Sequence, residues 1–190
     1  MDSPSRESLG PTIDVGQGAG VTTLRYALAM TLCAAEPLMP PLHKIPESVL
    51  VVIHTPDLQV LMLERADQPG FWQCVTGSKD SLDEPLLATA RREVQEETGI
   101  EAAPEQFRDW ALVNRYEIYP VWRHRYAPDV THNSEHVFGL LVSPGTAVRL
   151  APREHLQYRW LPWTEAADLC FSPSNAEAIL HLPTLLGASA

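Results

Sequence analysis

The sequence has no apolar run long enough to cross a membrane. Its most membrane-like stretch, residues 26–35, is about half of the roughly 20 residues that a spanning helix needs. The residues before this stretch also carry no cluster of basic side chains of the kind that opens a secretory signal peptide. We therefore expect a cytoplasmic protein with no membrane association.

Cysteines are few and far apart. The three, Cys33, Cys74 and Cys170, form no C-x-x-C pair, which argues against a zinc knuckle or a redox motif. Free thiols in a reducing compartment are the simplest interpretation of so small and odd a number.

Positive charge is also scarce, because 14 Lys and Arg face 24 Asp and Glu and give a formal net charge of -10. Binding to nucleic acid depends on cationic side chains that neutralise phosphates, so we expect no nucleic-acid partner. A small ligand with several phosphates would need metal ions or a local basic pocket. The sequence does not indicate the oligomeric state.

The chain of 190 residues is long enough for one domain with a buried core. Residues 1–42 are rich in Ser, Gly and Pro and are expected to form a flexible extension outside the fold. Whether this extension is translated in the native protein stays open, because Met39 stands just before the domain. We expect the domain at residues 43–183 and a short tail at 184–190.

Apolar patterning within this domain predicts both strands and helices. The β-branched runs at 48–54 and 59–65 flank a short turn and predict a hairpin. The clearest helix spans 84–98, with a Pro in its first turn and Gly99 just past its end. Further strands are expected at 71–76, 110–114, 117–119, 136–142 and 157–161, and a closing helix at 174–180. The pattern favours an α+β domain with a sheet flanked by helices.

The helix at 84–98 carries Glu93, Glu96 and Glu97, whose spacings of three and four place them on neighbouring positions of one face. Carboxylates so close repel one another, and they are also unfavourable near the negative end of the helix dipole. A divalent cation would reverse this cost, and oxygen ligands favour Mg²⁺ or Mn²⁺ over zinc. Without further context, the alternative is a solvated acidic helix face.

The surrounding residues supply that context. The segment from Gly77 through Glu84 to residues 92–100 resembles the Nudix box, a glycine, five residues, a glutamate, seven residues, then R-E-U-x-E-E-x-G-U with U apolar. From Glu84 onward every fixed position matches. Six residues rather than five separate Gly77 from Glu84, so Ser78 takes the strict glycine position. Whether Gly77 still reaches the metal site stays open at this point.

The resemblance implies the Nudix fold, an αβα sandwich with a mixed β-sheet, and hydrolysis assisted by Mg²⁺, with Mn²⁺ as an alternative. It implies that Glu93 and Glu97 are metal ligands and that Glu96 is either a further ligand or the catalytic base. Glu154 matches a distal acid that completes the metal site. The residues expected to support the box are Gly77, Glu84 and Arg92.

Short motifs at 60–65, 71–78, 123–128 and 154–160 are similar to those of the bacterial dihydroneopterin triphosphate diphosphatases within this family. That similarity implies hydrolysis of the triphosphate to the monophosphate and pyrophosphate in folate biosynthesis. Residues 116–119 would line the site of a flat pterin, and the segment 123–126 would provide a cationic wall for the triphosphate. The residues expected to contact substrate are Lys44, Arg65, Thr76, Tyr116, Glu117, Ile118, Tyr119 and Ser172.

Two alternatives share these motifs. One is a Nudix enzyme that hydrolyses nucleoside triphosphates or dinucleoside polyphosphates, because it would use the same metal machinery. The other is a catalytically silent sensing module, which predicts loss of the helix glutamates. All of them are present, and this favours a hydrolase.

Overall fold

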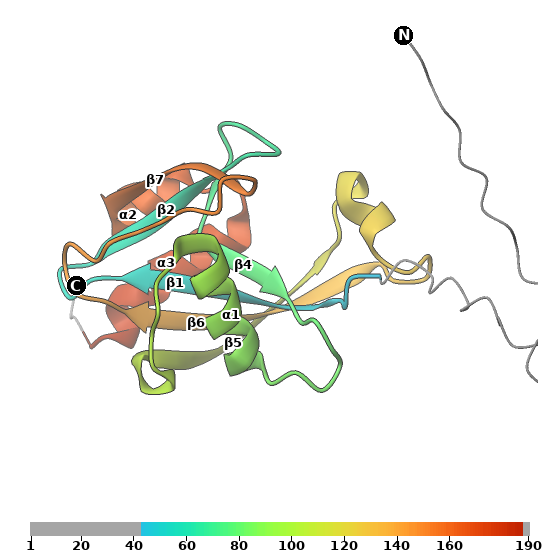
Figure 1. Ribbon diagram of the computed structural model, residues 1–190, viewed down its shortest axis with the longest axis horizontal. Helices are drawn as coiled ribbons and strands as arrows, with labels where there is room; N and C mark the ends of the chain where they lie inside the picture. The colour runs from blue at the N-terminus through green and yellow to red at the C-terminus, as the bar shows by residue number, and fades with distance from the viewer. Residues whose placement is uncertain (1–42, 188–190) are drawn as a thin grey trace, which may run out of the picture. The chain divides into compact units, whose positions relative to one another are not determined.

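The computed structural model describes residues 43–187, so the predicted extension 1–42, Cys33 and the last three residues of the predicted tail lie outside it. The described part of the chain contains both strands and helices, with four strands before the first helix (Figure 1). In chain order the elements are β1 (Glu47–His54), β2 (Gln59–Arg65), β3 (Trp72–Gln73), β4 (Val75–Ser78), α1 (Leu86–Thr98), η1 (Pro104–Gln106), β5 (Phe107–Glu117), η2 (Pro120–Arg125), β6 (His132–Leu141), β7 (His155–Pro162), α2 (Trp163–Leu169) and α3 (Pro173–Leu185).

The strands form one mixed sheet with β1 and β6 at its centre. These two run parallel along the whole of β1, from Glu47 opposite Ser134 to His54 opposite Leu141. The main strand order is β3-β2-β1-β6-β5, while β4 pairs with β1 and β7 pairs with β2. The predicted mixed sheet is therefore confirmed.

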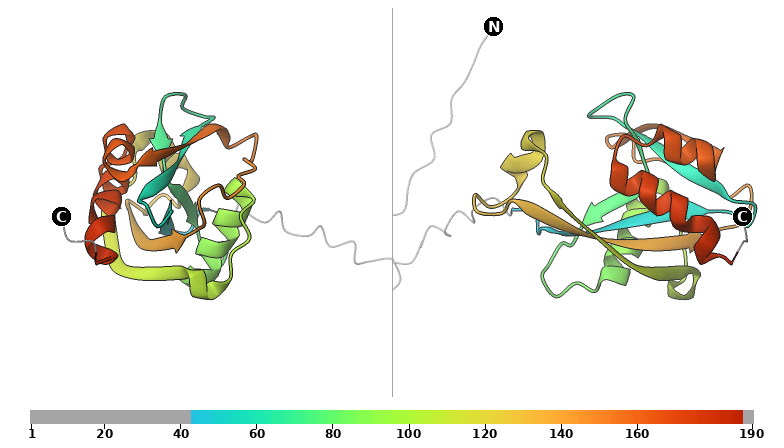
Figure 2. Two further views of the ribbon diagram at one scale, coloured as in Figure 1. Left: turned by 90° about the vertical axis from the view of Figure 1, so that its left-hand side faces the viewer. Right: turned by 180° about the vertical axis from the view of Figure 1, so that it is seen from behind.

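Helices cover both faces of this sheet, with α1 on one side and α2 and α3 on the other (Figure 2, left). Alternate residues of β1 explain why both faces are covered. Leu50 and Val52 pack in the core beneath α2 and α3, whereas Val49, Val51 and Ile53 pack in the core beneath α1. A strand buried on both faces has to be apolar throughout, which accounts for its unbroken hydrophobic run. The αβα sandwich is confirmed.

The predicted hairpin of β1 and β2 is right at its turn and wrong along its length. The two strands pair at His54 and Val60 and then separate. Strand β4 occupies the edge of β1 from Ser48 to Val51, so β2 takes β7 as its main partner instead.

Two further strand predictions need correction. The strand expected at 71–76 is split at Cys74, whose backbone N–H donates to Asn175 Oδ1 at 2.8 Å instead of to a neighbouring strand. The strand expected at 110–114 lies within β5, which is irregular where Ala111 has a φ of 54°. Of the strand expected at 117–119, only Glu117 belongs to β5. Hydrophobic periodicity predicts neither a hydrogen bond from a backbone N–H to a distant side chain nor a local bulge.

Helix α1 ends as predicted, at Gly99, whose φ of 67° is left-handed. It begins at Leu86, two residues later than expected. The short helix α2 was not predicted, because seven residues give little periodic signal. Helix α3 continues to Leu185, beyond the expected helix end and domain boundary. No helix among residues 43–187 has the length and hydropathy required to cross a membrane.

Candidate active site

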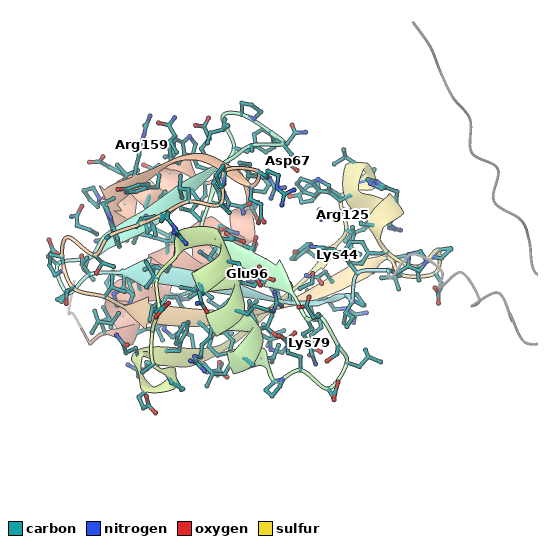
Figure 3. All side chains as sticks on the ribbon, viewed as in Figure 1. Lys44, Asp67, Lys79, Glu96, Arg125 and Arg159 are labelled. Atoms are coloured by element: carbon teal, nitrogen blue, oxygen red, sulfur yellow. The ribbon has the colours of Figure 1, made fainter. Side chains whose placement is uncertain are left out.

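The three helix glutamates do not share one environment. Glu93 and Glu97 are four residues apart and are buried toward the sheet together with Ala90 and Val94, whereas Glu96 is exposed. The labelled Glu96 projects from α1 in Figure 3. Its carboxylate lies 3.2 Å from the guanidinium of Arg92. The face of α1 that meets the sheet therefore carries two of the three predicted acids.

Glu97 lies close to Glu154, the distal acid that the resemblance predicts for the metal site. The metal-ligating atoms of Glu97, Glu154 and His155 all lie within 4.8 Å of one another. His155 Nε2 is 2.8 Å from Glu97 Oε2, and both side chains are only 3% exposed. His155 was not predicted. Its position beside Glu154 was a signal, but its inward orientation follows from the start of β7.

The buried carboxylates of Glu93 and Glu97 are poorly solvated. Burial, together with the neighbouring charge of Glu97, raises the pKa of Glu93 to about 7, although Arg92 opposes the shift. Burial also raises the pKa of Glu97, while the hydrogen bond to His155 lowers it. A divalent cation would relieve both the repulsion and the lost hydration. The donors, mostly carboxylate oxygens, fit such a cation.

Gly77 lies so close to Glu93 that a residue with a side chain would not fit at this position. A Cβ at position 77 would overlap the carboxyl group of Glu93. The loop before α1 absorbs the extra residue, and Gly77 rather than Ser78 faces the glutamate. Gly77 therefore lies beside Glu93 despite the extra residue in the loop.

Arg92 ties this loop to the helix. Its guanidinium donates to the Ser78 carbonyl at 2.9 Å, to Glu93 at 2.8 Å and to Glu84 at 3.2 Å. Burial acts to raise the pKa of Glu84, but Arg92 and the Asp80 backbone N–H outweigh it and lower that pKa. Arg92 thus joins the loop and Glu84 to Glu93, and the supporting role of Arg92 and Glu84 stays a prediction.

A cavity opens on the opposite face of β4. Most of the residues expected to contact substrate line it, namely Lys44, Arg65, Thr76, Tyr116, Ile118, Tyr119 and Ser172. The structure does not bring Glu117 to this cavity. Residues alternate between faces along β5, so Glu117 points away from Tyr116, is 73% exposed and lies 3.8 Å from Arg123.

Aromatic rings form the rim of the cavity. Trp122 meets Tyr119 and Phe171 edge to face, with ring centroids 5.4 and 6.3 Å apart. The guanidinium of Arg65 lies over Trp122 at 4.9 Å. Trp122 and Phe171 were not predicted, because they come from η2 and from the connection between α2 and α3.

Two of the cations that line the cavity are Lys44 and Arg125. Lys44 and Arg125 are close together near η2 (Figure 3), and the Lys44 backbone N–H donates to the Arg125 carbonyl at 2.9 Å. Burial and the charge of Arg125 lower the pKa of Lys44, against the attraction of Glu93 and Glu97. Of the predicted cationic wall, Arg125 lines the cavity, whereas Arg123 donates to the Val130 carbonyl.

A strand, a glycine in contact with a helix glutamate, and a helix of buried carboxylates form the arrangement of a phosphate-anhydride hydrolase. The family model described as NUDIX domain matches residues 44–182, and the chain belongs to that family.

Two curated relatives share most of this domain. The dihydroneopterin triphosphate diphosphatase of Escherichia coli K12 is 44% identical over 140 residues, which cover 72% of this chain and 91% of that protein. The Haemophilus influenzae protein of the same name is 41% identical, covering 72% and 87%. The solved structure of the E. coli dihydroneopterin triphosphate pyrophosphohydrolase matches with a TM-score of 0.66, covering 72% of this chain and 94% of that one.

Proposed function

We propose that this protein hydrolyses dihydroneopterin triphosphate to dihydroneopterin monophosphate and pyrophosphate. The 44% identity to the E. coli enzyme of that name, over 91% of its length, carries this proposal. The reaction breaks one P–O bond of the α,β-anhydride and adds the elements of water. It implies a cytoplasmic enzyme of folate biosynthesis that acts on a small molecule.

The geometry supports a substrate that spans β4. Aromatic rings and buried polar groups suit a flat bicyclic base, and Lys44, Arg65 and Arg125 suit a chain of phosphates. Thr76 lines the cavity while the next residue, Gly77, touches Glu93. A base bound in the cavity would therefore direct its phosphates toward the glutamates.

We assign cation binding to Glu93, Glu97 and Glu154, and retain Glu96 as a further ligand or the base that deprotonates water. Mg²⁺ is the proposed ion, and Mn²⁺ also suits oxygen donors. When bound, the ion neutralises phosphate oxygens and lowers the pKa of the attacking water. Arg92 holds Glu93 at 2.8 Å, and Gly77 gives it room.

The remaining roles concern substrate binding. Lys44 and Arg65 would bind the phosphates, and Thr76 and Ser172 would donate or accept hydrogen bonds through their hydroxyls. Tyr116, Ile118 and Tyr119 would contact the ring. This division predicts that selection of the base and cleavage of the anhydride depend on different residues.

The test is product analysis of the purified chain with Mg²⁺ or Mn²⁺ and a substrate panel. The panel contains dihydroneopterin triphosphate, canonical and 8-oxo nucleoside triphosphates, and diadenosine polyphosphates. We expect the highest kcat/KM for the pterin, with pyrophosphate as coproduct, because this ratio defines specificity. A higher ratio for a nucleotide would leave the hydrolase chemistry intact and replace the substrate. No turnover of any compound would support the sensing module instead.

A further inference from the structure

The inner end of the cavity contains buried polar side chains that the Nudix box does not account for. Asn133 and Glu135 are only 2% and 4% exposed, on the face of β6 that also carries the core residue Val137. Ser48, 6% exposed, lies on β1 directly opposite Glu135. Alternation would place apolar residues at these positions, because the same face continues into the core beneath α2 and α3. Polar residues there indicate a requirement other than packing.

Asn133 presents an acceptor with no donor. Its amide nitrogen donates to Ser48 Oγ at 2.6 Å and to Tyr116 Oη at 3.1 Å. Its carbonyl oxygen, Oδ1, is one of two buried side-chain polar atoms without a partner among residues 43–187. Buried polar atoms are nearly always hydrogen-bonded in folded proteins. A ligand that donates from its ring edge would satisfy this oxygen.

Glu135 adds a carboxylate with no cation beside it. It lines the same cavity, and no ion pair within residues 43–187 includes it. Asn114 donates to its Oε1 at 3.3 Å, a long hydrogen bond. A buried carboxylate without a countercharge, in a ligand cavity, is suited to recognise a donor-rich ligand edge.

We propose that Glu135 determines which base the cavity accepts, by binding the adjacent amino group and ring N–H of a 2-amino-4-oxopyrimidine ring. This inference rests on the proposed function, because it names how the pterin would be selected. The two donors lie side by side on the ring, and a carboxylate can accept both at once. The neighbouring Asn133 Oδ1 offers a further acceptor.

The same arrangement would reject adenine. Adenine presents an amino donor beside an unprotonated ring nitrogen, and that nitrogen would face a carboxylate oxygen with no proton between them. Glutamine at position 135 has one acceptor and one donor, which is the complement of adenine and mismatches the pterin edge. Glu135→Gln should therefore change the preference of the cavity rather than weaken all binding alike.

The experiment measures equilibrium binding of dihydroneopterin triphosphate and of ATP to the whole chain in EDTA, where metal-dependent hydrolysis is suppressed. Wild type should bind the pterin more tightly. Glu135→Gln should bind the pterin about 10-fold or more weakly, as expected for loss of a charge-assisted hydrogen bond, and bind ATP as tightly as wild type or more so. Glu177→Gln, on the exposed side of α3, is the control and should leave both affinities unchanged.

Equal weakening of both ligands by Glu135→Gln, in a variant that melts at or above the wild-type Tm, would overturn the inference, because Glu135 would then not distinguish the two bases. Unchanged pterin binding would also overturn it. Hydrolysis by wild type is measured separately with Mg²⁺. If the preference changes as expected and the pterin is not hydrolysed, the proposed function fails and the inference stands. If the pterin is hydrolysed and the preference does not change, the reverse holds.

Discussion

Buried acids lie on both sides of β4, and the two groups are organised in different ways. On the α1 side, Glu93 and Glu97 come from one helix, and the three residues between them place them on the same face. On the cavity side, Glu135 comes from β6, with Ser48 on β1 and Asn114 on β5 beside it. The two buried helix acids are thus encoded in one short segment, whereas the cavity is assembled from strands far apart in the chain. Substitutions on the two sides should have separable effects.

Glu97→Gln tests the helix side and should have the largest effect. Removing one carboxylate from the cluster should lower kcat by about 100-fold or more, because it removes electrostatic stabilisation of the transition state. The relative kcat/KM values for pterin and nucleotides should stay as in wild type. Glu101→Gln, an exposed position past the end of α1, is the matched control. Steady-state rates close to wild type in Glu97→Gln would contradict the metal assignment.

Gly77→Ala tests the contact that joins the two sides. The new methyl group would overlap the Glu93 carboxylate, so the glutamate or the strand has to move. We expect kcat to fall by about 10- to 100-fold, since small displacements of catalytic groups have effects of this size.

The mechanism of that loss can be checked by combining Gly77→Ala with Glu93→Gln. If both act through the same carboxylate, the double variant should be no slower than the slower single variant. Fully additive losses would show that Gly77 acts through some other group.

Lys44→Gln tests the lysine that lines the cavity and is also attracted by the helix glutamates. Because Lys44 lines the cavity and is attracted by both Glu93 and Glu97, its loss should raise KM by about 10-fold for every triphosphate alike. This differs from Glu135→Gln, which should discriminate between bases. Lys79→Gln removes a lysine that is paired with Glu47 at 2.9 Å and should leave KM unchanged. A loss confined to the pterin would place Lys44 at the ring instead.

The smallest expected effect is that of Glu135→Gln on stability, and its size depends on pH. Burial raises the pKa of Glu135 above 4.5 in the folded protein, even though Ser174, Asn114 and Tyr116 lower it. The folded state therefore retains a proton that the unfolded state releases, and stability decreases as pH rises through that window. The variant has no carboxyl group at this position, so its stability does not decrease in this way. Its Tm should exceed that of wild type by roughly a few degrees at pH 7, and the difference should diminish toward pH 4. A variant that melts below wild type at pH 7 would show that Glu135 stabilises the fold.

Elements with strong local patterns were predicted well. The β-branched runs of β1 and β2 and the end of α1 at Gly99 fall where expected. The split at Cys74 was missed because Asn175, a residue far along the chain, accepts the backbone hydrogen bond that a strand neighbour would have taken. Pairing partners are decided by which edges remain available in three dimensions.

The candidate site divides in the same way. Spacing on α1 placed Glu93, Glu96 and Glu97 on one face, but the burial of the first and third and the exposure of Glu96 depend on the packing of α1 against the sheet. Alternation along β5 excludes Glu117 from the cavity, and that face was assignable only once the neighbouring strand was known.

The sequence by itself determined the helix glutamates, the family resemblance and the general αβα architecture, because these depend on spacing within single segments. Only the tertiary structure decided that Gly77 contacts Glu93, that His155 meets Glu97, and that Glu135 lies in the cavity. The physical reason is that each of these contacts joins residues from different strands or helices. Hydrophobic periodicity constrains which face of an element is buried, while sheet pairing and helix packing determine what that face meets.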